Sequence, residues 1–172
     1  MRSGYGNSTV ANFTRSMTRK LVLAALFAAM GVFLSSFATP ALGARVFPFQ
    51  HAINAIAGVI LGPWWAAGSA LVTATMRVSL GTGSLFAFPG SPFGALVVGF
   101  AYHWLRRDEA ALFEPFGTVL IGATLGAALI SPFIGPAAGG LFALMLAFAL
   151  SSIPGAIIGY LVLKALRKTG VL

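Results

Sequence analysis

The stretch of sequence that decides the fold runs from His51 to Val78 and reads HAINAIAGVILGPWWAAGSALVTATMRV. Gly62-Pro63 separates its two apolar halves. This dipeptide can kink one long helix or reverse the chain between two short helices, because proline removes a backbone donor and glycine permits a turn. The choice sets the number of apolar helices in the chain, and with it the side of a membrane that each later loop faces.

The whole chain has the composition of a membrane protein. It is 172 residues long, 58% hydrophobic and only 8% charged, and chains this apolar are built for lipid. Nearly all of that length is needed to cross a bilayer several times, so a soluble catalytic domain is excluded. The apolar segments are Leu21–Ala38, His51–Leu61, Trp64–Val78, Phe93–Leu105, Phe116–Phe133 and Ala137–Leu163.

Basic residues choose between the kink and the reversal. If the cluster before the first segment is cytoplasmic, a reversal at Gly62-Pro63 places the later basic clusters on the cytoplasmic side too, whereas a fused helix places them outside. The clusters are Arg15, Arg19 and Lys20, then Arg106 and Arg107, then Lys164, Arg167 and Lys168. We therefore expect an all-α membrane protein, a six-transmembrane-helix bundle with both the N and the C terminus cytoplasmic.

The expected domain organisation follows from these segments. Residues 1–18 form a loose cytoplasmic tail, 19–168 the six-helix membrane domain and 169–172 a cytoplasmic C-terminal end. The first apolar run after basic residues also resembles a secretory signal peptide, but it is longer than the usual apolar core of about 7–15 residues. The excess of basic residues is explained by topology, so no nucleic-acid partner is expected.

The acidic residues bear on the source of energy. Only three are present, Asp108, Glu109 and Glu114, all in the connection before the fifth segment, so we expect no carboxylate at membrane depth. Proton-coupled carriers usually need such groups, and ATP-driven ones need a phosphate-binding GxxxxGK[ST] loop, which is absent. These absences favour a solute-binding subunit that is energised by another protein.

Two connections that face outward carry the candidate binding residues. The first contains Phe47, Gln50, His51 and Asn54, and Gln50 and Asn54 lie one helical turn apart on one face. The second contains Ser84, Phe86, Phe88 and Ser91. Ring faces with a few hydrogen-bonding groups suit a small, flat, neutral or weakly polar solute.

Two further residues have alternative interpretations. His51 contacts a ligand or is simply a histidine at an interfacial helix start. It has no expected His, Cys or carboxylate partner, so neither a metal site nor any other cofactor is expected. Arg77, just before the glycine-rich loop, reaches the headgroups, or instead holds loop carbonyls or meets the ligand.

Small residues in the first apolar segment predict close helix contacts. Ala24 and Ala28 form one pair spaced by four residues, and Ala25 and Ala29 form another. Such pairs let helix backbones approach closely. They pack inside the bundle or form a strip for another protein.

Three motifs resemble a known family. They are Phe47-Pro48-Phe49-Gln50-His51-Ala52-x-Asn54, Gly58-x-x-Leu61-Gly62-Pro63 and Gly81-Thr82-Gly83-Ser84-Leu85-x-x-Phe88-Pro89-Gly90-Ser91. The chain from Arg19 to about Lys168 is similar to the ThiW family of S components, the substrate-binding subunits of energy-coupling-factor (ECF) transporters. The resemblance implies a bundle of the ECF S-component type, multi-pass in a prokaryotic plasma membrane and in contact with its lipid, with a substrate pocket that opens outward.

The resemblance also implies partners and a solute. The partners are a membrane-embedded T component, which docks on Ala24, Ala25, Ala28 and Ala29, and two cytoplasmic ATPases. The solute is hydroxyethylthiazole, a small neutral heteroaromatic precursor of thiamine. Two alternatives stay open: an S component for another vitamin, and a self-sufficient secondary carrier or facilitator. A membrane enzyme ranks third, because the sequence shows no nucleophile–base constellation.

Overall fold

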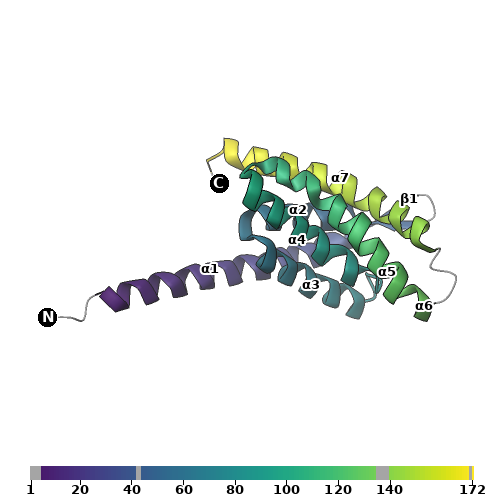
Figure 1. Cartoon of the computed structure of the whole chain (residues 1–172), viewed down its shortest axis with the longest axis horizontal. Helices are drawn as coiled ribbons and strands as arrows, with labels where there is room; N and C mark the ends of the chain where they lie inside the picture. Colours follow the sequence, from purple (N-terminus) through teal and green to yellow (C-terminus); the bar gives the residue numbers. More distant parts are fainter. Residues whose placement is uncertain (1–4, 42–43, 135–139, 171) are drawn as a thin grey trace.

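The computed structural model describes residues 5–41, 44–134, 140–170 and 172. These are almost entirely helical, and the helices lie side by side in an elongated bundle (Figure 1). The elements are α1 (Tyr5–Leu34), η1 (Ser35–Phe37), β1 (Thr39–Ala41), β2 (Ala44–Val46), α2 (Pro48–Leu61), α3 (Pro63–Ser79), α4 (Ala87–Leu105), η2 (Asp108–Phe113), η3 (Phe116–Gly122), α5 (Ala123–Leu129), α6 (Ser131–Ile134) and α7 (Gly140–Lys168).

Helix α1 begins at Tyr5, well before the apolar run. The sequence predicted a loose tail here, but the first proline of the chain is Pro40, so no proline interrupts the helix as it extends toward the N terminus. Figure 1 shows this end of α1 projecting beyond the other helices. The structure therefore corrects the prediction of a loose tail from Tyr5 onward, because this part is helical. Residues 1–4 lie outside the described part of the chain.

The chain reverses at Gly62, as charge parity predicted. Helix α2 ends at Leu61 and α3 begins at Pro63. Gly62 has φ +81°, a left-handed value that glycine adopts without a Cβ penalty. Pro63 occupies the first turn of α3, where its missing N–H would have no helical partner anyway. Two separate helices, α2 and α3, therefore replace the single kinked helix.

Contacts between the helices fix their relative directions. The hydroxyls of Ser69 and Thr73 on α3 donate to the carbonyls of Ala24 and Ala28 on α1, at 2.8 and 3.3 Å. Both residue numbers rise together by four, so α1 and α3 run parallel. Pro63, at the start of α3, lies against Gly99 near the end of α4, so α3 and α4 run in opposite directions.

The remaining helices follow the same alternation. On α2, Pro48 and Ala52 lie against Gly155 and Gly159 of α7, so α2 and α7 run parallel. Helix α4 runs parallel to α2, because Asn54 reaches Ser91 and Gly58 lies against Ala95 and Val98. The segment of η3 and α5 runs opposite to α4, with Gly122 against Gly90 and Gly126 against Phe86.

Three helical stretches of the described residues are long and apolar enough to cross a membrane: Ser16–Phe37, Asp108–Leu129 and Gly140–Lys168. Helix α2 is apolar but shorter. The second stretch begins at Asp108 and not at Phe116 as expected, so it includes all three acidic residues. The expected start of the last segment, Ala137, lies outside the described residues. Helix α7 continues through Pro154 as one helix.

Candidate functional site

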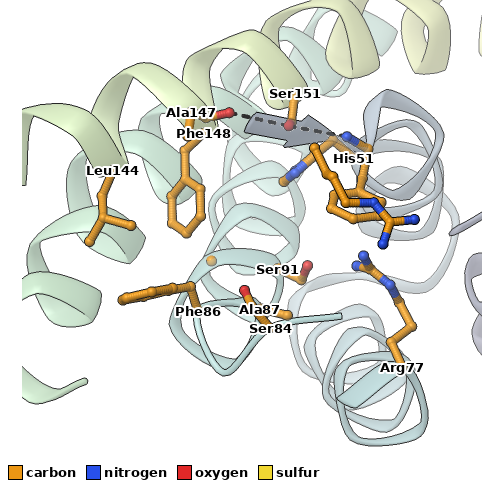
Figure 2. Close-up of a pocket in the computed structure, with 13 residues that line it drawn as sticks. His51, Arg77, Ser84, Phe86, Ala87, Ser91, Leu144, Ala147, Phe148 and Ser151 are labelled. Atoms are coloured by element: carbon orange, nitrogen blue, oxygen red, sulfur yellow. Dashed lines mark hydrogen bonds between the residues drawn. The ribbon is translucent and has the colours of Figure 1, made fainter. Parts of the chain in front are cut away.

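A cavity of about 140 Å³ opens among α2, α3, α4 and α7. It is small beside the roughly 300–1,000 Å³ of pockets for drug-sized ligands, so a single small ring is a better fit than a large vitamin. Figure 2 shows the lining side chains. They are Arg45, Phe47, His51, Arg77, Ser84, Phe86, Ala87, Gly90, Ser91, Leu144, Ala147, Phe148 and Ser151.

The cavity has an apolar side and a polar side. Phe86, Phe148 and Leu144 lie together on one side in Figure 2, and Arg77 and His51 lie on the other. Apolar surface at one end and hydrogen-bonding groups at the other hold a ligand that has the same two-part character. The arrangement therefore suits an aromatic ring with one polar substituent.

Arg77 is buried at the polar side, with only 3% of its surface exposed. Its guanidinium carbon lies 4.2 Å from the centre of the Phe47 ring, within the range of a cation–π contact. Its carbonyl accepts the backbone N–H groups of Thr82 and Gly83, at 2.9 and 3.0 Å, which ties the loop to the end of α3. Snorkelling to the headgroups is thus the wrong interpretation, because Arg77 is enclosed and faces the cavity.

His51 lies on the polar side and has a carboxylate partner, contrary to the sequence-based expectation. Its Nδ1 lies 2.7 Å from Glu114 Oε1. The Thr118 hydroxyl donates to the same oxygen at 2.7 Å, while Glu114 Oε2 has no hydrogen-bond partner among the described residues. Glu114 is fully buried. With one ring nitrogen held by Glu114, the orientation of the imidazole at the cavity is fixed.

The position of Glu114 corrects the prediction that no carboxylate lies at depth. Gly155, which packs against His51, lies near the middle of α7, so the His51–Glu114 pair is halfway along the bundle. The fifth segment starts earlier than hydropathy indicated, and this start carries Glu114 inside. A glycine at position 94 is what leaves space for it, because a Cβ there would meet Glu114 Oε1 and Thr118 Oγ1.

The other two acids lie at the end of the bundle where α7 finishes. Asp108 pairs with Arg167 Nε, and Arg167 also donates to the Tyr102 hydroxyl at 3.2 Å. The Tyr160 hydroxyl donates to Glu109 at 3.3 Å. Of the three acidic side chains, Glu114 is therefore the one that lies next to the cavity, and Arg77 has no acidic partner among the described residues.

Three expected binding residues do not line the cavity: Gln50, Asn54 and Phe88. Gln50 donates to Asn54 Oδ1 at 3.3 Å, and Asn54 donates to the carbonyl of Ser91 at 3.2 Å. Both residues are only 1% exposed. They share a face, as predicted, but this face joins α2 to α4 behind the cavity wall.

Several lining residues were not expected from the sequence. Helix α7 contributes Leu144, Ala147, Phe148 and Ser151, and β2 contributes Arg45. The Ser151 hydroxyl accepts the backbone N–H of Phe47 at 3.2 Å and donates to the Ala147 carbonyl (Figure 2). Helix α7 reaches the cavity because Gly155 and Gly159 let it pack closely against α2.

The alanine strip on α1 divides into two faces. Ala24 and Ala28 are buried against α3, where their carbonyls accept bonds from Ser69 and Thr73. Ala25 and Ala29 are exposed on the other face, which also carries exposed large apolar side chains. These are Leu21, Val22, Leu26, Met30 and Phe33.

Comparison with known proteins identifies the family. Residues 21–169 match the family model described as thiamine-precursor transporter protein, ThiW. No curated protein and no solved structure matches the chain. The match covers most of the 172 residues and includes all four helices around the cavity. This chain therefore belongs to the ThiW family of thiamine-precursor transporter proteins.

Proposed function

We propose that this protein is the substrate-binding S component of an ECF-type importer in a prokaryotic plasma membrane, and that the cavity among α2, α3, α4 and α7 binds hydroxyethylthiazole. The observation that carries the proposal is the two-sided cavity. Phe86 and Phe148 provide faces for the thiazole ring, and His51, Ser151 and Arg77 provide partners for the hydroxyl.

The proposed topology has six membrane-spanning segments with both termini in the cytoplasm, residues 1–18 as a cytoplasmic extension and 19–168 as the membrane domain. The alternating helix directions support it, as do the basic residues at one end of the bundle. Figure 1 shows the described ends of α1 and α7 toward the same end, opposite β1 and α6. The cavity then opens to the outer side.

The proposed partners are a T component and two cytoplasmic ATPases. The exposed face of α1 supports docking, because Ala25 and Ala29 allow close approach while the surrounding apolar side chains provide contact area. Ala24 and Ala28 support the same surface from inside by holding α1 on α3. Docking is therefore proposed only for the exposed half of the alanine strip, Ala25 and Ala29. Surrounding lipid covers the rest of the apolar surface.

A second function is favoured by one observation. Buried carboxylates and histidines at membrane depth mark proton pathways in many carriers, and the His51–Glu114–Thr118 cluster is such a group. The sequence-based argument against a proton-coupled carrier, which was the expected lack of a carboxylate at membrane depth, therefore no longer holds. The competing proposal is a self-sufficient carrier that exchanges protons through this pair.

Transport in proteoliposomes separates the two functions. The purified chain alone should bind hydroxyethylthiazole in calorimetry but should not accumulate it in vesicles with an imposed pH gradient. Uptake should appear when the T component and ATPases are added, with ATP supplied on the side that the ATPases face. Accumulation by the chain alone, abolished by a protonophore, would instead establish the carrier.

A further inference from the structure

Charge is distributed unevenly around the cavity. Two guanidinium groups line it, those of Arg45 and Arg77. All three acidic side chains of the sequence have other positions: Asp108 and Glu109 lie at the far end with Arg167 and Tyr160, and Glu114 lies behind His51. No acidic side chain is therefore left to neutralise either arginine.

The His51–Glu114 pair cannot reverse this excess. If one proton is shared so that both groups are charged, or if both are neutral, the pair contributes no net charge. If only Glu114 is charged, it contributes one negative charge, and two arginines outweigh it because guanidinium groups stay protonated in proteins. The cavity is therefore positive in every protonation state of the pair.

Arg77 also has an unused donor. Its Nε is buried without a hydrogen-bond partner among the described residues, and one terminal nitrogen reaches the Thr82 carbonyl only at 3.5 Å. The Phe47 ring stabilises the charge in part. A buried guanidinium with unused N–H groups is a strong partner for a carboxylate or phosphate, which it binds through two parallel bonds.

We propose that the cavity selects an anionic heteroaromatic solute, a small ring that carries a phosphate or carboxylate, over the neutral alcohol. This inference rests on the proposed function and refines its substrate class. The ring lies against Phe86 and Phe148, and the anion lies between Arg77 and Arg45. A solute with a positive ring, such as a thiazolium, is disfavoured by the same two charges.

Three probes with one ring system test the proposal: hydroxyethylthiazole, its phosphate ester and its N-methylated thiazolium. In calorimetry at low salt, the phosphate should bind about ten- to a hundredfold more tightly than the alcohol, as expected for a charge-assisted hydrogen bond. The thiazolium should bind most weakly. The advantage of the phosphate should shrink as salt screens the outer arginine.

Variants of the two arginines show which side chain produces the preference for the phosphate. Arg77→Gln should remove most of the phosphate advantage, because it should lower affinity for the phosphate much more than affinity for the alcohol. Arg77→Lys should keep part of the advantage. If Arg77→Gln does not fold, Arg45→Gln, on the exposed β2 position, should still reduce the advantage. Equal or tighter binding of the alcohol by the wild-type protein would overturn the proposal and leave the thiazole transporter intact.

Two further experiments distinguish a solute anion site from a lipid headgroup site. A comparison of phenyl phosphate with benzyl alcohol tests the anion site without a thiazole. If phenyl phosphate stabilises the wild-type protein but not Arg77→Gln, the anion site is supported even if no thiazole binds. If none of the thiazoles binds, that result would refute only the proposed solute and not the anion site. Phosphatidylglycerol that competes with phenyl phosphate, with no preference for the phosphate ester, would assign Arg77 to a lipid headgroup and overturn the proposal.

Discussion

Glu114 and Asp108 come from the same short acidic stretch, yet they do different things. Asp108 is 8% exposed and pairs with Arg167, whose side chain is 42% exposed, at the end of the bundle where α7 finishes, so water reaches the pair from the Arg167 side. Glu114 is fully buried, pairs with His51 and Thr118, and lies behind the cavity. Glu114 directly follows η2, which begins at Asp108 and ends at Phe113, so this short element joins the two environments.

The difference between these two carboxylates shows how burial changes the contribution of an ion pair to stability. An ion pair that water reaches contributes little to stability, because solvent screens it and ordering the side chains costs entropy. A buried pair depends on both partners, since removal of one leaves the other without compensation. The Asp108–Arg167 pair therefore joins helices at the end of the bundle, whereas the His51–Glu114 pair is part of the candidate site halfway along it.

The largest expected effect comes from Glu114. Glu114→Ala leaves His51 and Thr118 buried without their partner and should lower the free energy of unfolding by about 3–5 kcal/mol. Asp108→Ala should lower it by about 1 kcal/mol or less. Chemical unfolding in detergent measures both. Equal losses of stability would mean that the two ion pairs are equivalent and would contradict the claim that burial distinguishes them.

The contact between α7 and α2 comes next. A Cβ at Gly155 would meet the Pro48 carbonyl and His51, so Gly155→Ala should separate the helices and cost about 1–3 kcal/mol of stability. Gly68 on α3 has nothing within 4 Å of such a Cβ and is exposed. Gly68→Ala is the matched control and should be neutral or stabilise by up to about 1 kcal/mol. A harmless Gly155→Ala would contradict this packing.

The buried amides should have a similar or smaller effect. Asn54→Ala removes the donor to Ser91 and a partner of Gln50, and should cost about 1–3 kcal/mol of stability. Its effect on solute affinity should be indirect and weaker than that of His51→Ala, which removes a cavity group. Glu109→Gln, at the exposed Tyr160 bond, is the control and should change the melting temperature little. Loss of binding by Asn54→Ala with no loss of stability would place Asn54 in the binding site.

The smallest expected effect on stability is on α1. Ala25→Trp adds a large side chain on the exposed face, so the isolated protein should fold and bind solute as before. Copurification of the T component and ATP-dependent uptake should nevertheless be lost. Ala24→Trp is the control, because it points at α3 and should destabilise the protein itself. Normal uptake by Ala25→Trp would exclude docking on this face.

Much of the fold could be predicted from the sequence, because hydropathy and charge are local signals. The apolar runs marked the helices, and charge parity together with Gly62-Pro63 gave the reversal between α2 and α3. The start of α1 and the start of the fifth segment could not be predicted. Helix α1 extends through polar residues, and the helical turns of η2 contain acids that a hydropathy boundary excludes.

The candidate site was predictable only in part, for a physical reason. Phe47, His51, Arg77, Ser84, Phe86 and Ser91 belong to segments whose polar and aromatic content is unusual in an apolar chain, and they do line the cavity. Phe148 and Ser151 belong to an ordinary apolar helix, and only the packing of α7 on α2 brings them there. Glu114 was missed because its partner His51 is 63 residues away.

The most direct test of the account fills the cavity and measures binding. Ala147 lines the cavity on α7, and Ala143, one turn earlier, is exposed. Ala147→Phe should lower the affinity for hydroxyethylthiazole and its phosphate by about tenfold or more in calorimetry, because overpacking costs roughly 1–3 kcal/mol, while Ala143→Phe should bind like the wild-type protein. Unchanged affinity in Ala147→Phe, with the fold intact, would show that the solute binds elsewhere.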